Sequence, residues 1–252
     1  MNKINRKKNY RGHKKTITEK RLNQKNVLIR NLSNKYSKHF LNPRTETLIN
    51  LDNYSLDQIL FFHKLYKKIL KQPGSILELG VQFAPNTFLL QQLRKSLEPK
   101  NVSRRIIAID TFSGFKNLTK YEKKKLKKNM FSVPNSFYKD LVNLNNVIYK
   151  NEILKKTEII KGKAEGQLKK ILKKDKSLVF SLIIFNMNLY KPTINCLKII
   201  NKRILKGSII FFNEFACDKY PGETQAVLEF LKNKKYKLKY HHGLSYGAYI
   251  ET

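Results

Sequence analysis

The feature that most constrains the fold of this chain is a regular alternation of strand-like and helix-like segments after residue 74. Apolar runs typical of strands lie at residues 75–81, 104–112, 157–163, 178–187, 207–215, 236–242 and 245–251. Segments with apolar residues at helical spacing lie at residues 86–97, 119–130, 165–174, 191–204 and 223–233. This alternation predicts a mostly parallel sheet with helices on both faces. Only the short stretch HGLS separates the last two strand segments, so we expect them to form an antiparallel hairpin at the sheet edge.

A further helix is predicted before the first strand. Ser55 and Gln58 match the S-x-x-Q capping box, and the apolar residues that follow have helical spacing. The pair Pro73-Gly74 ends this pattern. Ordered structure is therefore expected to begin near Asn53.

The first part of the chain has a different composition. Residues 1–30 contain eleven Lys or Arg and one acid, Glu19, with few apolar side chains. Such a segment cannot bury enough apolar surface to fold alone. We predict a basic, partly disordered extension at residues 1–41, followed by one α/β domain at residues 42–252. The extension has three interpretations: an arm along RNA phosphates, a solvated tail, or an organellar address, which the excess of Lys and Asn over Arg disfavours.

The charge of the whole chain has two interpretations. The 52 Lys and Arg against 18 Asp and Glu give a net charge of +34, which favours polyanionic partners such as RNA, DNA or an anionic membrane surface. Abundant Lys, Asn, Ile and Phe without any Trp are also what the codon usage of an AT-rich genome produces. Both interpretations remain open.

Membrane and redox signals are weak. No apolar run approaches the roughly 18 residues that span a bilayer, and the first residues lack the apolar segment of a signal peptide. The two cysteines, Cys196 and Cys217, form neither a disulfide framework nor a metal-ligand spacing. We expect a soluble protein of the cytoplasm, with an organellar matrix as the alternative.

Ligands of open parallel sheets bind beyond the carboxyl ends of the strands, so the residues there are the candidates for a site. Glu78 and Gly80 close the first strand, and the next helix begins near Asn86 and offers its N–H groups. A single glycine after a strand is also common in a purely structural turn. Asp110, followed by Thr111, ends the second strand and suits ribose hydroxyls; the alternative is that Asp110 caps the following turn.

The fourth and fifth strands end in amides. Asn186 and Asn188 follow the fourth strand, and Asn213 and Glu214 follow the fifth, so these two loops are expected to face each other. Mg²⁺ and similar hard cations prefer carboxylate oxygens, of which this set offers one. We therefore predict no tight metal site.

From Asn42 to its last residue the chain resembles class I S-adenosylmethionine (SAM)-dependent methyltransferases, in particular the macrocin-O-methyltransferase-like (TylF) family. The stretches that carry the resemblance are LDNYSLDQILFFHKLYKKIL, PGSILELGVQFAPNTFLLQQLR, RRIIAIDTFSGF, LYKPTINCLKIINKRILKGSIIFFNEF and YPGETQAVLEF. The resemblance implies a Rossmann-like seven-strand methyltransferase sheet and metal-assisted O-methyl transfer at the ends of strands four and five. The SAM-binding positions that it implies are Glu78, Gly80, Asp110, Thr111 and Asn186.

The departures from the family pattern lie at the positions that the resemblance assigns to metal binding, catalysis and cofactor binding. The family typically has D-x-D-x-Y where this chain has NMNLY, ending at Tyr190, and two acids where it has Asn213-Glu214. Three expected carboxylates are therefore amides, which retain shape but cannot act as general bases at neutral pH. Alanine also replaces a usual glycine at Ala84, and Lys163 stands where an Asp near the adenine is common.

Two functions follow from this mixture. The first is SAM-dependent O-methyl transfer to a small-molecule or sugar-like acceptor, metal-poor or metal-free, with Glu214, Asn188 and Tyr190 as the candidate catalytic residues. Methyl transfer depends largely on positioning, so loss of a metal need not abolish it. The alternative is a noncatalytic methyltransferase fold that binds RNA within a ribosomal or other large assembly, through the basic extension.

Overall fold

The computed structural model describes residues 24–25, 27–29, 31–32, 34–35, 43–122, 126–148, 156–241 and 247–252. The chain divides into two units, Met1–Gln58 and Ile59–Thr252. Helix α2 (Pro43–Asn50) belongs to the first unit, and helix α3 (Asn53–Ile69) begins in the first and ends in the second. Most of the predicted basic extension lies outside the described residues, and its boundary at residue 41 stays a prediction.

The start of α3 differs from the predicted capping box. The helix begins at Asn53, so Ser55 lies inside its first turn. The side chain of Asp52 is the cap instead, because its Oδ1 accepts a hydrogen bond of 2.7 Å from the Ser55 N–H. The prediction of Ser55 as the capping residue is therefore wrong, because the cap lies three residues earlier. The helix itself is confirmed.

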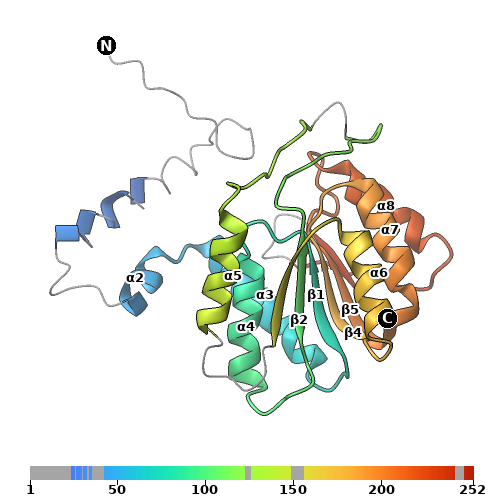
Figure 1. Ribbon diagram of the computed structural model, residues 1–252, viewed down its shortest axis with the longest axis horizontal. Coiled ribbons are helices and arrows are strands. Elements are labelled where there is room, and N and C mark those ends of the chain that lie inside the picture. The colour runs from blue at the N-terminus through green and yellow to red at the C-terminus, as the bar shows by residue number, and fades with distance from the viewer. Residues whose placement is uncertain are drawn as a thin grey trace. The chain divides into compact units, whose positions relative to one another are not determined.

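A six-stranded sheet forms the centre of the second unit, with the strand order β3-β2-β1-β4-β5-β6 (Figure 1). Its strands are β1 (Ser75–Leu79), β2 (Ile106–Asp110), β3 (Thr157–Lys161), β4 (Phe180–Phe185), β5 (Ile204–Phe212) and β6 (Ala248–Glu251). Strands β1 to β5 are parallel, and β6 runs antiparallel to β5. The central strands β1 and β4 are buried along their whole length, which explains their continuous apolar sequences.

Helices cover both faces of this sheet (Figure 1). Besides α3, they are α4 (Pro85–Leu97), α5 (Phe137–Ile148), α6 (Ala164–Lys174), α7 (Tyr190–Ile200) and α8 (Pro221–Leu231), with a short 3₁₀ turn at Asn201–Arg203. Apolar residues of α3 and α4 pack on one face of the sheet, and those of α6, α7 and α8 pack on the other. The predicted mostly parallel α/β architecture is thus confirmed.

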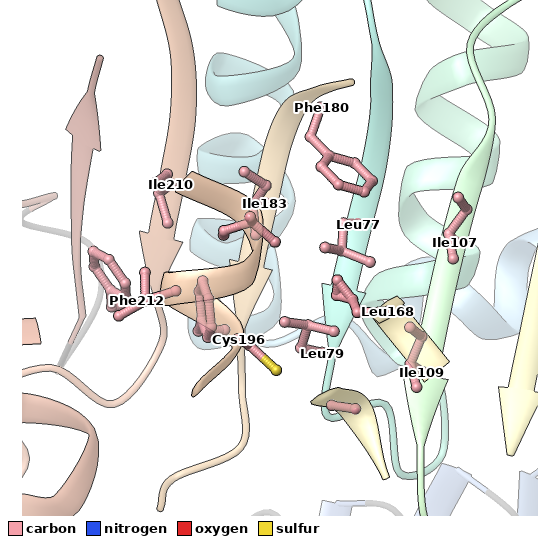
Figure 2. Close-up of a cluster of buried hydrophobic side chains, with 14 of the residues drawn as sticks. Leu77, Leu79, Ile107, Ile109, Leu168, Phe180, Ile183, Cys196, Ile210 and Phe212 are labelled. Carbon is pink, nitrogen blue, oxygen red and sulfur yellow. The ribbon is translucent and has the colours of Figure 1, made fainter. Parts of the chain in front are cut away.

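The larger core cluster lies under α6, α7 and α8 (Figure 2). Leu77 and Leu79 of β1 contribute to it, whereas Ile76, which precedes Leu77, faces the opposite cluster, as the alternation of a strand requires. Leu168 of α6 and Cys196 of α7 close this side, and both are almost fully buried. Cys196 is therefore a core residue, and burial raises the pKa of its thiol.

The described residues form six strands and not the predicted seven. Residues 236–241 contribute one antiparallel bridge, in which Lys239 and Tyr249 exchange N–H···O bonds of 2.8 and 2.9 Å. In this segment Lys237 and Tyr240 are exposed, and the other four residues are partly buried. The predicted antiparallel edge is confirmed through β5 and β6, while residues 242–246 of the predicted hairpin lie outside the described residues.

The helix predicted at residues 119–130 is wrong. The described part of this segment consists of turns and irregular structure, and the helix that follows it is α5, which the sequence did not predict. Leu126 and Met130 of this segment pack instead into a small separate cluster. That cluster contains Phe115, Leu118, Leu126, Met130 and Phe131 together with Leu189, Cys217 and Tyr220. Tertiary packing overrides local helix propensity here.

A buried ion pair fixes the amino end of the sheet. The guanidinium of Arg104 is 2.7 Å from Glu98 Oε2 and donates hydrogen bonds of 2.9 Å to the carbonyls of Ile69 and Gln72. Those carbonyls lie at the end of α3, so Arg104 supplies the partners that a helix end lacks. Within the described ranges, each helix is too short or too polar to cross a membrane.

Candidate functional site

The candidate site lies where the strand order reverses. Strand β1 sits between β2 and β4, so the chain winds outward from it in both directions. In folds of this type, ligands bind beyond the carboxyl ends of the strands at this switch point. Backbone hydrogen bonds hold these ends in line: Gly80 N–H to Ile109 O (3.0 Å), Asn186 N–H to Leu79 O (2.8 Å) and Asn213 N–H to Phe185 O (2.9 Å). The structure therefore brings all four predicted strand ends together.

Asp110 binds the loop that follows β1. Its Oδ2 accepts hydrogen bonds from Val81 N–H (2.6 Å) and Gln82 N–H (2.8 Å), and its Oδ1 accepts one from Phe112 N–H (2.6 Å). The bond to Phe112 confirms the turn-capping alternative. A carboxylate offers about four acceptor positions, and within the described residues these three bonds leave one on Oδ1. That position suits a ligand hydroxyl.

Thr111 and Gly80 have structural contacts at the same edge. The Thr111 hydroxyl oxygen accepts a hydrogen bond of 3.3 Å from Ser113 N–H. Gly80 has a φ of +90°, and an added Cβ would lie 2.1 Å from the carbonyl oxygen of Asn186. Glycine is therefore required here by the close approach of the β4 backbone, which supports the structural-turn interpretation.

Glu78 is a fully buried carboxyl group in the middle of this edge. Its Oε2 accepts a hydrogen bond from the Thr87 hydroxyl, while its Oε1 finds no hydrogen-bond partner among the residues that the structure describes. Burial raises the pKa of Glu78 to about 8; hydrogen bonding by Thr87 and Asn86 acts in the opposite direction, and the nearby charge of Asp110 adds a smaller increase. An unpartnered buried oxygen of this kind is a natural place for a ligand donor.

The loop between β1 and α4 contains left-handed residues. Ala84 precedes α4 with a φ of 63°, and Gln82 has a φ of 51°. The left-handed region costs a residue with a Cβ roughly 1–2 kcal/mol relative to the right-handed one. The alanine that departs from the family pattern thus adopts the conformation that a glycine would adopt without this cost.

The loops after β4 and β5 are joined by their amide side chains. Asn213 Nδ2 donates to Asn186 Oδ1 at 3.2 Å and also lies 3.4 Å from Glu214 Oε1. Glu214 is partly exposed and is the only carboxylate among the four predicted residues of these two loops. The expected juxtaposition of the two loops is confirmed.

Glu223, which sequence reasoning did not select, bridges the same two loops. Its Oε2 accepts a hydrogen bond of 3.3 Å from Asn188 N–H, and its Oε1 accepts one of 2.8 Å from Glu214 N–H. The side chain is fully buried, and burial raises its pKa to about 8. Asn188 is itself buried and has a φ of 64°. Glu223 thus helps to hold the left-handed backbone of Asn188, which was predicted as a catalytic residue.

Tyr190 is held by two acids. Its N–H donates a hydrogen bond of 2.7 Å to Glu122 Oε1, and a Cβ added at Gly222 would meet the same oxygen at 2.0 Å. The Tyr190 hydroxyl donates to Glu229 of α8, and this hydrogen bond is the main cause that raises its pKa to about 12. The structure therefore directs this hydroxyl to an exposed part of α8.

The donor set at the edge does not suit a divalent cation. Asn186, Asn188 and Asn213 offer neutral amides, and Glu214, which is partly exposed, offers the one carboxylate of this set. Hard cations such as Mg²⁺ take carboxylate oxygens and dehydrate reluctantly. Throughout the part of the chain that the structure describes, no group of three or more His, Cys, Asp or Glu is arranged to hold a metal ion.

Neither a protein-family model nor a curated protein matches this chain. Solved structures do match it. The crystal structure of CalS11, a calicheamicin methyltransferase, has a TM-score of 0.81 at 24% identity, over 94% of this chain and 93% of that one. The apo structure of CalS11, named as TDP-rhamnose 3'-O-methyltransferase of calicheamicin biosynthesis, gives 0.74 at 23% identity, over 94% and 95%. The O-methyltransferase NovP gives 0.62 at 13% identity, over 78% and 79%.

These matches define the class of the fold. The chain has the methyltransferase fold of CalS11 and NovP, with the same kind of parallel sheet and antiparallel edge. The resemblance inferred from the sequence is thereby confirmed at the level of the fold. Because fold alone does not establish chemistry, the activity has to be argued from the residues at the switch point.

Proposed function

We propose that this chain is a SAM-dependent methyltransferase that transfers a methyl group to a hydroxyl of a small-molecule or sugar-like acceptor. The observation that carries the proposal is the pair of acids at the switch point. Glu78 of β1 has an unpartnered buried oxygen, and Asp110 of the neighbouring strand β2 has one remaining acceptor position. The names of CalS11 and NovP, both O-methyltransferases, support the same class of acceptor group.

The residues present fit the cofactor. The open position on Asp110 Oδ1 would accept a ribose hydroxyl, and Glu78 Oε1 would face a cationic donor such as an ammonium group. An ammonium beside Glu78 would lower its pKa and stabilise the carboxylate, offsetting the effect of burial. Gly80, Thr111 and Asn186 complete the proposed cofactor edge. When bound, SAM supplies an electrophilic methyl group on a sulfonium.

The acceptor side is assigned to the loops after β4 and β5. Glu214 is the residue there that can take the proton of an acceptor hydroxyl, because the amides of Asn186 and Asn188 cannot. Asn188 would orient the acceptor by hydrogen bonding. A catalytic role for Tyr190 would require its hydroxyl to exchange Glu229 for the acceptor. Most of the rate enhancement would then come from positioning.

The activity is tested by incubating the full chain with methyl-labelled SAM and a panel of hydroxylated acceptors that includes sugar nucleotides. We expect label to appear in at least one acceptor and to be lost in Glu214→Gln, which keeps the shape of the side chain but removes the base. Equal turnover by the wild-type chain and Glu214→Gln would contradict the assigned role.

A second candidate function is RNA binding without catalysis. It is favoured by the net charge of +34 and by the eleven Lys or Arg among residues 1–30. Under either function we propose that residues 1–41 form a basic extension of the domain at residues 42–252. We also propose that residues 236–241 occupy the place of a seventh strand, supported by the bridge between Lys239 and Tyr249.

A further inference from the structure

Two separate ties join the loop after β4 to the loop after β5. The first is the hydrogen bond of 3.2 Å from Asn213 Nδ2 to Asn186 Oδ1. The second is Glu223, whose two carboxyl oxygens accept the N–H of Asn188 in one loop and of Glu214 in the other. Both ties run between side chains or backbone groups of this chain alone.

The first tie depends on the residues being amides. An amide carries a donor and an acceptor, so two asparagines attract each other directly. Two carboxylates at this separation are both acceptors and both negative, so they repel unless a cation lies between them. The sequence resemblance implies acids at both positions, whereas in this chain Asn186 and Asn213 are joined by a direct hydrogen bond of 3.2 Å.

The second tie requires a carboxyl group, that of Glu223, to be buried. A buried carboxyl group requires partners, because its desolvation is unfavourable. The chain has only 18 acids against 52 bases, yet Glu78, Glu122 and Glu223 have no exposed surface. All three lie at the carboxyl edge of the sheet, and Glu122 and Glu223 bind the backbone N–H groups of the three candidate catalytic residues. Glu122 and Glu223 are therefore buried where they hold the backbone of the loops that carry the candidate catalytic residues.

We propose that the Asn186–Asn213 amide pair and the buried Glu223 carboxyl group take the place of a divalent ion as the bridge between the β4 and β5 loops. The acceptor side of the site is then assembled by the chain itself and needs no metal. For its catalytic meaning this inference rests on the proposed methyltransferase function. Its structural content is independent of that function, because metal binding and thermal stability can be measured without SAM or an acceptor.

The experiment compares Mn²⁺ binding, measured by the electron paramagnetic resonance signal of free Mn²⁺, in three full-length proteins. These are the wild type, Asn186→Asp/Asn213→Asp, and the control Asn143→Asp/Asn233→Asp, which adds the same charge at exposed positions. We expect the wild type and the control to bind equally weakly, and Asn186→Asp/Asn213→Asp to bind at least about tenfold more tightly. Either tight binding by the wild type or no gain over the control would overturn the inference.

Thermal unfolding supplies the second readout. Without metal, Asn186→Asp/Asn213→Asp should melt several degrees below the wild type, and Mn²⁺ should restore most of the loss, whereas Mn²⁺ should leave the wild type unchanged. A wild type that gains several degrees with Mn²⁺ would contradict the proposal. If the protein binds no SAM but shows these metal responses, the proposed function fails and the inferred bridge stands.

Discussion

Asn188 and Glu223 are 35 residues apart in the chain, and the N–H of Asn188 donates a hydrogen bond of 3.3 Å to the buried Oε2 of Glu223. The same carboxyl group accepts the N–H of Glu214 through Oε1. One side chain from the first turn of α8 thus holds the backbone of two candidate catalytic residues, in the loops that follow two different strands. The geometry of the acceptor side depends on this contact.

Removal of this side chain should destabilise the domain. Glu223→Ala leaves the buried N–H of Asn188 and the partly buried N–H of Glu214 without their acceptor. A fully buried group costs about 1–3 kcal/mol and a partly buried one less, so we expect a loss of about 2–4 kcal/mol in the free energy of unfolding. Glu223→Gln keeps one acceptor oxygen and should lose less. Urea denaturation measures both values. A loss below about 0.5 kcal/mol in Glu223→Ala would show that the loops do not depend on this residue.

The buried acids should also give the stability a specific pH dependence. The pKa of Glu223 is raised from an ordinary 4.5 to about 8, so between these values the folded state retains a proton that the unfolded state releases. The contribution of Glu223 is therefore greatest below pH 4.5 and falls as the pH rises to about 8. The slope is at most about 1.4 kcal/mol per pH unit.

This effect is isolated by comparison with Glu223→Gln, which cannot titrate. We expect the wild type to lose stability relative to Glu223→Gln as the pH is raised from 5.5 to 7.5. Glu78, whose pKa is also raised to about 8, should behave in the same way against Glu78→Gln. Parallel stability curves for variant and wild type across this range would contradict the assignment of a raised pKa.

The glycine after β1 should be intolerant of substitution. In Gly80→Ala the new Cβ would meet the Asn186 carbonyl oxygen at 2.1 Å, and the positive φ would be strained as well, so we expect a loss of more than about 2 kcal/mol. Gly166→Ala is the matched control, since it lies in α6 with no atom within 4 Å of its new Cβ. That change should stabilise the chain by about 0.5–1 kcal/mol. Chemical denaturation distinguishes the two, and equal effects would refute the close approach.

The basic extension can be tested separately. If residues 1–30 contact RNA, their deletion should lower the affinity for a structured RNA and reduce the salt dependence of binding, because fewer counterions are released. Fluorescence anisotropy over a range of salt concentrations measures both. Unchanged affinity and slope in the deletion variant would exclude the extension as the RNA contact.

The sequence predicted the parts of the fold that depend on local pattern. Strands such as β1 and β4 are buried on both faces and are visible as continuous apolar runs. Helix α5 was missed because its sequence, FYKDLVNLNNVI, is rich in asparagine and β-branched residues, which have low helix propensity. The lysine-rich segment at 119–130 had the stronger helical signal, but its apolar side chains pack into a separate cluster.

The candidate site was predictable only in part. Asp110 and Asn186 were found because they end strands, and strand ends meet at one edge of a parallel sheet. Glu223 gave no such signal, since an acid in the first turn of a helix normally interacts with the helix dipole at the surface. Its role arises from two loops that converge on it from distant parts of the chain, which no local pattern records.

The measurement that tests the central claim most directly is calorimetric titration of the full-length chain with SAM, with and without Mg²⁺. The account predicts one site with a dissociation constant in the micromolar range, unchanged by Mg²⁺ and weakened at least about tenfold in Asp110→Asn. Asp140→Asn, an exposed change on α5, should bind like the wild type. Absence of SAM binding by the wild type under both conditions would contradict the account.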